Sequence, residues 1–240
     1  MRGGVNYRPM PHAVLFDLGS TLWDDYPAEL HCWQLLTRLL AQRGIQATLE
    51  DLIALSERVI ASYSPSLTRS MVYQLVGGRL DVYHAIFEEI KHEIIERYRD
   101  PDEFRRLNPL FPGVHELLEM LARNYPLGVV SQNYSEAKHW MEYHGIAGYF
   151  KSISLSGKEQ LYKPDLRLFL HACQGVGVEP REAVMVGDRL DNDVWPANRL
   201  HMQSVRVLAD PYRIQHPRYH TDVPDYTLES ISDLLLVVPL

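Results

Sequence analysis

Residues 13–25 read AVLFDLGSTLWDD, and this stretch decides the fold. Its first four residues are apolar and predict a short buried strand that ends at Asp17. The small residues Gly19, Ser20 and Thr21 follow and are typical of a turn. In open parallel sheets, ligands bind beyond the carboxyl ends of the strands. Asp17 therefore stands where chemistry is expected, although the position two residues later, where a second carboxylate could carry protons, is a glycine.

Short apolar stretches of the same kind recur in the second half of the chain, with helical segments between them. They are found at residues 127–131, 152–155, 183–187 and 204–208. Short strands that alternate with helices predict a parallel sheet with crossover helices. We therefore predict an α/β fold, with a Rossmann-like parallel sheet, flanking helices and the strand at residues 13–17 as one of its members.

A helical block separates the first strand from the others, over residues 27 to 100. Pro27 suits the first turn of a helix, and Thr48 to Asp51 form a capping pattern for a second one. A third helix carries apolar residues three and four apart between Leu80 and Ile94. We predict an inserted helical domain over residues 23–105, and a core domain formed by residues 10–22 and 106–240.

Composition excludes several classes of partner. The chain has 240 residues, 46% of them hydrophobic, and a net charge of -7, which argues against broad binding to nucleic acid or anionic membranes. It has no apolar run near the roughly 18–20 residues that span a bilayer. The N-terminal residues lack the apolar centre of a signal peptide, and the two cysteines are too few for a disulfide framework. We expect a cytoplasmic protein.

Polar residues gather at the predicted carboxyl ends of the strands. Each has an ordinary explanation as a helix cap, a turn residue or a solvated lysine, but their combination indicates one site. They are Asp17, Ser131 with Gln132, Lys163 before Pro164, and Asp188 with Asn192 and Asp193. Carboxylate and carbonyl oxygens suit Mg²⁺, while a hydroxyl and an ammonium hold phosphoryl oxygens. An ionised Asp17 is then a competent nucleophile that forms an aspartyl-phosphate.

In this order, the motifs resemble those of the haloacid dehalogenase superfamily of hydrolases. The four motifs begin at Asp17, Ser131, Lys163 and Gly187, and the resemblance covers nearly the whole chain. It implies that the helical insertion is the small cap domain of that superfamily, and that residues 225–238 form its last strand and helix.

The resemblance implies a role for each residue that carries it. Asp17 would be the nucleophile and Ser131 would bind the phosphoryl group, with Gln132 as a second substrate-binding residue. Lys163 would balance the phosphoryl charge and orient the nucleophile. These roles imply a small phosphorylated molecule as the substrate.

A Mg²⁺ site is implied in the same way. Asp17 and Asp188 would be direct ligands, and Gly19 would contribute its backbone carbonyl, which does not depend on a side chain. Asn192 and Asp193 would support the site from nearby.

Gly19 departs from the pattern, because phosphatases of the superfamily usually carry a second aspartate at this position. That aspartate protonates the leaving oxygen and then activates water, a contribution of about 10²–10⁴ in rate. Asp24, Asp25 and His31 are nearby alternatives for the proton. If only the proton carrier is missing, Gly19→Asp should raise turnover.

The leading prediction is a Mg²⁺-dependent phosphatase acting on a small phosphate monoester. The alternative is a catalytically silent homologue that binds a phosphorylated ligand or a partner. Two minor alternatives also lack the second aspartate. A 2-haloacid dehalogenase needs no proton, but it works without a metal and does not keep a carboxylate such as Asp188. A phosphonatase needs a lysine early in the cap. The only lysine of the predicted cap is Lys91, which lies late in the third helix.

Overall fold

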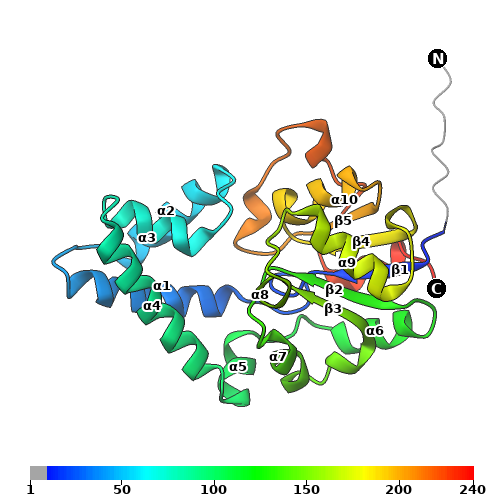
Figure 1. Cartoon of the computed structure of the whole chain (residues 1–240), viewed down its shortest axis with the longest axis horizontal. Helices are drawn as coiled ribbons and strands as arrows, with labels where there is room; N and C mark the ends of the chain where they lie inside the picture. The colour runs from blue at the N-terminus through cyan, green and yellow to red at the C-terminus, as the bar shows by residue number, and fades with distance from the viewer. Residues whose placement is uncertain (1–9) are drawn as a thin grey trace.

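The computed structural model describes residues 10–240. It contains a six-stranded parallel sheet in the order β3-β2-β1-β4-β5-β6 (Figure 1). The strands are β1 (Ala13–Phe16), β2 (Leu127–Ser131), β3 (Phe150–Leu155), β4 (Ala183–Gly187), β5 (Gln203–Val207) and β6 (Tyr226–Leu228). The predicted α/β fold is confirmed. Strand β3 begins two residues earlier than predicted, because Phe150 pairs with Leu127 across a register shift.

Strand β1 lies at the centre of the sheet and is buried on both faces. Val14 and Phe16 pack on one face with helices α6 and α7, whereas Ala13 and Leu15 pack on the other with α9 and α10. A strand covered on both faces has no polar side, which explains its continuous apolar sequence. The covering helices are α6 (Val114–Ala122), α7 (Ala137–Tyr143), α9 (Leu166–Val176) and α10 (Trp195–Arg199).

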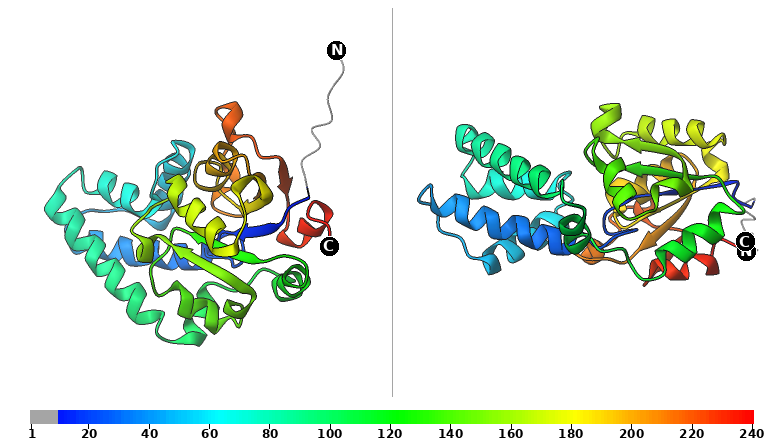
Figure 2. Two further views of the ribbon diagram at one scale, coloured as in Figure 1. Left: turned by 45° about the vertical axis from the view of Figure 1, so that its right-hand side comes forward. Right: turned by 90° about the horizontal axis from the view of Figure 1, so that it is seen from below.

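The helical insertion forms a second body beside the sheet, which we call the cap (Figures 1 and 2). Helices α1 to α4 have a hydrophobic core of their own around Trp33, Met71 and Ile86. The helices between β1 and α6 are α1 (Tyr26–Ala41), α2 (Leu49–Ala61), α3 (Leu67–Leu75), α4 (Leu80–Arg97) and α5 (Pro101–Leu107). The capping pattern at Thr48 is confirmed, since its side chain accepts from the backbone of Asp51 and the Asp51 side chain accepts in return. The domain boundaries at residues 22–23 and 105–106 stay a prediction.

Two helices between β1 and α6, α3 and α5, were not expected from the sequence. Helix α3 has nine residues and α5 has seven, so neither is long enough to repeat an apolar stripe. The start of α5 is visible in hindsight, since the Asp100 side chain accepts from the backbone N–H of Asp102 and Pro101 follows the cap.

The remaining elements are short. They are α8 (Ser156–Glu159), the π-helical turn η3 (Leu190–Val194), and the 3₁₀ turns η1 (Ala147–Tyr149), η2 (Pro180–Glu182), η4 (Tyr212–Ile214), η5 (His220–Asp222) and η6 (Ile231–Leu236). Within residues 10–240, no helix has the length and apolar character needed to cross a membrane.

Candidate active site

The polar residues predicted at the strand ends come together at one edge of the sheet. Asp17 follows β1, Ser131 ends β2 and Asp188 follows β4, and these three strands are neighbours. All three residues line a polar cavity of about 200 Å³. The other predicted site residues that line this cavity are Gly19, Gln132, Lys163 and Asn192. Asp193 lies behind it, in contact with Lys163.

Lys163 pairs with two carboxylates in the interior. Its Nζ atom lies 3.0 Å from Oδ1 of Asp17 and 2.5 Å from Oδ1 of Asp193. Burial alone would lower the pKa of Lys163, but the charges of Asp17 and Asp193 outweigh it and raise the pKa above its ordinary value. Lys163 is therefore an ammonium ion held against the side chain of Asp17.

Asp193 is fixed on both of its oxygens. Oδ1 accepts from Lys163, and Oδ2 accepts from the backbone N–H of Arg189 at 3.0 Å. This arrangement requires a glycine at position 187, because a Cβ atom there would lie 2.4 Å from Cγ of Asp193. Burial raises the pKa of Asp193 to about 6, although the Lys163 charge opposes this rise.

The donors beside Asp17 fit a divalent cation. Carboxylate oxygens of Asp17, Asp188 and Asp193 lie within 4.8 Å of one another. Oδ2 of Asp188 and Oδ1 of Asn192 are buried and have no hydrogen-bond partner among residues 10–240. Burial, with the charges of Asp193 and Asp17, raises the pKa of Asp188 well above its ordinary value. Mg²⁺ would be coordinated by such buried oxygen atoms that lack hydrogen-bond partners. Asp193 is a less suitable ligand, because both of its oxygens already accept hydrogen bonds.

The carboxyl group of Asp25 lies over Gly19. A Cβ atom at position 19 would be 2.1 Å from Oδ2 of Asp25, so a side chain there needs Asp25 to move. Gly19→Asp would therefore not simply add a missing carboxylate, because the Asp25 carboxyl already occupies the space of that side chain. Burial raises the pKa of Asp25 to about 7; its hydrogen bond with Ser20 lowers the pKa and the charge of Asp17 raises it.

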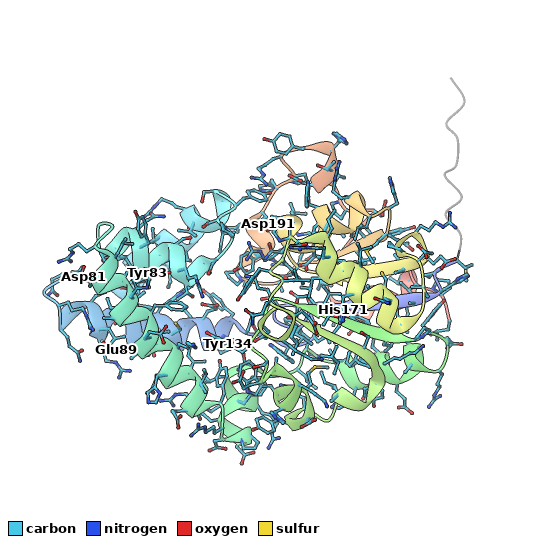
Figure 3. The ribbon with its side chains drawn as sticks, in the orientation of Figure 1. Asp81, Tyr83, Glu89, Tyr134, His171 and Asp191 are labelled. Carbon is cyan, nitrogen blue, oxygen red and sulfur yellow. The ribbon has the colours of Figure 1, made fainter. Side chains whose placement is uncertain are left out.

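A second, larger cavity of about 670 Å³ lies between the cap and the core. Figure 3 shows Tyr134, one of its lining residues, at the side of the core that faces the cap helices. The cap contributes the cations Arg69 and Lys91. The aromatic residues of its wall are Trp23, Phe87, Tyr98, Phe104, Tyr134, Trp140 and Tyr162. This cavity has room for a small molecule.

Sequence reasoning missed Arg189, which joins the core to the cap. Its guanidinium pairs with Asp191 at 2.6 Å and lies over the ring of Tyr212, 4.4 Å from the centroid. Its Nη2 atom donates to the carbonyl of Ser64, in the loop between α2 and α3, at 3.2 Å. Figure 3 shows Asp191 on the same cap-facing side. The only signal in the sequence is the position of Arg189 directly after Asp188.

Glu29 was also missed. It lies in the first turn of α1, where an acidic residue is ordinarily explained by the helix dipole. The structure instead places it in the wall of both cavities. Burial raises the pKa of Glu29 to about 7, and the charge of Asp25 adds to the rise.

Comparisons with known proteins find relatives of this chain in one family of hydrolases. The family of haloacid dehalogenase-like hydrolases matches residues 11–201. A glyceraldehyde 3-phosphate phosphatase of Methanopyrus kandleri is 28% identical, over 95% of this chain and 97% of that protein. Phosphoglycolate phosphatase 1 of Pseudomonas aeruginosa is 26% identical, over 94% of this chain and 79% of that protein. The solved structure of a putative phosphatase from Clostridium difficile shares the fold, with a TM-score of 0.73, 21% identity, and coverage of 96% and 99%.

Proposed function

Because the chain belongs to the haloacid dehalogenase-like hydrolases, we propose that it is a Mg²⁺-dependent phosphatase whose nucleophile is Asp17. The observation that carries this proposal is the 3.0 Å contact between Asp17 and the Lys163 ammonium, beside the unpartnered Oδ2 of Asp188. A carboxylate held by a cation, next to donors for a second cation, is arranged to receive a phosphoryl group rather than a neutral one.

The residues of the chain would divide the work as follows. An oxygen of Asp17 attacks phosphorus and forms an aspartyl-phosphate, which water then hydrolyses. Lys163 holds that carboxylate in place, and the Ser131 hydroxyl donates to a phosphoryl oxygen. Asp17, Asp188 and the carbonyl of Gly19 would hold Mg²⁺, which offsets the negative charge of the phosphoryl group.

The relatives suggest which substrates to test first. Their names specify glyceraldehyde 3-phosphate and phosphoglycolate, both small phosphate monoesters. The two cavities suit such molecules, since the smaller one accepts the phosphoryl group and the larger one the remainder. Arg69 and Lys91 in the larger cavity favour a substrate with a further polar or anionic group.

The decisive experiment is a hydrolysis assay of the purified chain with a panel of phosphate monoesters, with and without Mg²⁺. We expect release of phosphate that depends on Mg²⁺ and is abolished by Asp17→Asn. The acid-quenched protein should carry a phosphoryl group on the peptide that contains Asp17. Asp102→Asn, at an exposed carboxylate of α5, is the matched control and should behave as the wild type. No hydrolysis of any ester would instead support the silent homologue, and hydrolysis that survives Asp17→Asn would show that Asp17 is not the nucleophile.

Lys91 is the observation that keeps a second candidate, a phosphonatase, in view, because it lines the same cavity as Lys163. A Schiff base between Lys91 and phosphonoacetaldehyde would be trapped by borohydride. Inactivation of the wild type by borohydride and that substrate, but not of Lys91→Arg, would support this candidate. Adding 2-haloacids to the same panel tests the remaining alternative.

A further inference from the structure

Hydrolysis of an alkyl phosphate needs a residue that carries a proton, and Gly19 has no side chain to do so. The leaving oxygen must gain a proton in the first step, and the attacking water must lose one in the second. On the basis of the proposed function, we propose that Asp25, at the start of the cap, is the general acid and base of this site.

The first support is the position of Asp25. Its Oδ2 lies 2.1 Å from the point where a Cβ atom of residue 19 would stand. The carboxyl therefore occupies the volume that a side chain at position 19 would fill, but it arrives from a residue six positions later. Asp25 directly precedes helix α1, so the same residue also joins the core to the cap.

Ser20 holds the carboxyl in this place. Its backbone is left-handed, with φ of 53°, which turns the loop back on itself. Its Oγ atom lies 2.5 Å from Oδ1 of Asp25 and 2.9 Å from the carbonyl oxygen of Asp210. Oδ2 of Asp25, the oxygen nearest to Gly19, has no part in these contacts and is the one left to exchange a proton with the substrate.

The second support is the relation of Asp25 to the two cavities. Asp25 lines both the small cavity with Asp17 and the large cavity with the aromatic wall. A monoester with its phosphoryl group against Asp17 and its remainder in the large cavity has its bridging oxygen where the cavities meet. This bridging oxygen is the atom that must be protonated.

The other nearby residues are placed less well. Asp24 accepts from the backbone N–H of Tyr26 at 3.0 Å and, like His31, lines neither of the two cavities. Glu29 is the real rival, because it also lines both. However, Glu29 lies one helical turn further on, and its Oε2 atom is 3.5 Å from Oγ1 of Thr68. It is not among the atoms nearest to the point where a Cβ atom of residue 19 would stand.

The two steps balance with Asp25 alone. In the first, an oxygen of Asp17 bonds to phosphorus, the bond from phosphorus to the leaving oxygen breaks, and that oxygen takes the proton of the Asp25 carboxyl. In the second, the Asp25 carboxylate takes a proton from water, whose oxygen bonds to phosphorus. The bond from phosphorus to Asp17 then breaks, phosphate leaves, and Asp25 is protonated again.

The test compares two substrates in Asp25→Asn, which keeps the Ser20 contact through Oδ1. With glycerol 3-phosphate, whose alkoxide must be protonated, we expect kcat to fall about 10²–10⁴-fold. With p-nitrophenyl phosphate, whose leaving phenolate needs no proton, we expect the first turnover within about tenfold of the wild-type rate. The second step still needs a base, so rapid mixing should show a burst of one nitrophenol per active site.

Matched variants separate this assignment from its rivals. Asp24→Asn should keep wild-type kinetics on both substrates. A substrate-selective loss and a burst in Glu29→Gln, with none in Asp25→Asn, would overturn the assignment in favour of Glu29. An Asp25→Asn variant that hydrolyses both substrates normally would also overturn it, while the proposed function would stand as long as Asp17→Asn is inactive.

A further experiment tests the assignment of Asp25 by moving the carboxyl group from position 25 to position 19. Gly19→Asp alone should lower turnover, because the new side chain meets the Asp25 carboxyl. The double variant Gly19→Asp with Asp25→Ser returns the carboxyl to position 19 and should recover at least about tenfold over Asp25→Asn. Higher turnover in Gly19→Asp alone would contradict the assignment, because it would mean that the wild type lacks a proton carrier.

Discussion

Lys163 and Asp193 form an ion pair in the interior, with Nζ 2.5 Å from Oδ1 and each side chain only 1% exposed. Removal of one partner from such a pair costs about 3–5 kcal/mol, because it leaves an uncompensated buried charge. We therefore expect Lys163→Met to lower the free energy of unfolding by this amount at neutral pH, as measured by urea denaturation. Lys158→Met is the control, since Lys158 pairs with Glu159 at an exposed position and should cost less than about 1 kcal/mol. Equal losses in the two variants would contradict this view of the interior pair.

Gly187 provides a second prediction, because Asp193 occupies the space where a side chain would begin. Gly187→Ala would place Cβ 2.4 Å from Cγ of Asp193, which is buried and bonded on both oxygens. Overpacking of this kind costs about 1–3 kcal/mol, and we expect it to displace Lys163 and lower activity as well. Gly148→Ala, where a Cβ atom meets nothing within 4 Å, is the matched control and should change neither stability nor activity. A neutral Gly187→Ala would show that the Asp193 loop yields easily.

Replacement of Asp188 should affect thermal stability in opposite directions with and without Mg²⁺. Its buried carboxyl has a raised pKa, so ionisation at neutral pH costs stability, and Asp188→Asn should raise the melting temperature of the metal-free protein. Mg²⁺ that binds only the folded state stabilises it by about 2.7 kcal/mol at a hundredfold excess over Kd. We expect Asp188→Asn to lose this increment, measured by thermal unfolding with and without Mg²⁺. An unchanged Mg²⁺ response would remove Asp188 from the metal site.

Much of the fold followed from the sequence because buried strands have a simple signature. The predicted strands at residues 127–131 and 183–187 have the bounds that the structure shows. A continuous apolar run between two turns has few alternatives when both faces of a sheet are covered. The short helices α3 and α5 were not predicted, because nine or seven residues are too few to show a helical repeat of apolar residues.

The residues of the candidate site could also be predicted from the sequence only in part. Asp17, Ser131 and Asp188 could be placed together, since they follow neighbouring parallel strands whose ends share one edge. The role of Asp25 could not be derived, because it depends on a left-handed turn at Ser20 that returns the chain over Gly19. Only the three-dimensional path of this loop distinguishes Asp25 from Asp24.

Glu29 allows a prediction about pH, since its pKa is raised from an ordinary 4.5 to about 7, chiefly by burial and then by the charge of Asp25. Between these values the unfolded chain loses the proton first, so stability falls as pH rises from about 4.5 to about 7. Glu29→Gln removes this titration. We expect its free energy of unfolding, relative to the wild type, to increase by about 1–3 kcal/mol between about pH 4.5 and about pH 8, since each pKa unit corresponds to about 1.4 kcal/mol.

Glu103 is the matched control for this effect, because its pKa is shifted in the other direction. Hydrogen bonds from Arg106 and Arg97 lower the pKa of Glu103 to about 2. This carboxylate stabilises the fold when ionised, and the contribution is lost as pH falls from about 4.5 toward 2. Glu103→Gln should therefore be destabilising at neutral pH and approach the wild type only in acid. Urea denaturation from about pH 2 to about pH 8 should show Glu29→Gln gaining stability over the wild type above about pH 4.5, and Glu103→Gln losing stability relative to the wild type between about pH 2 and about pH 4.5 and staying below it at neutral pH. No gain for Glu29→Gln above about pH 4.5 would mean that burial does not set the pKa of Glu29.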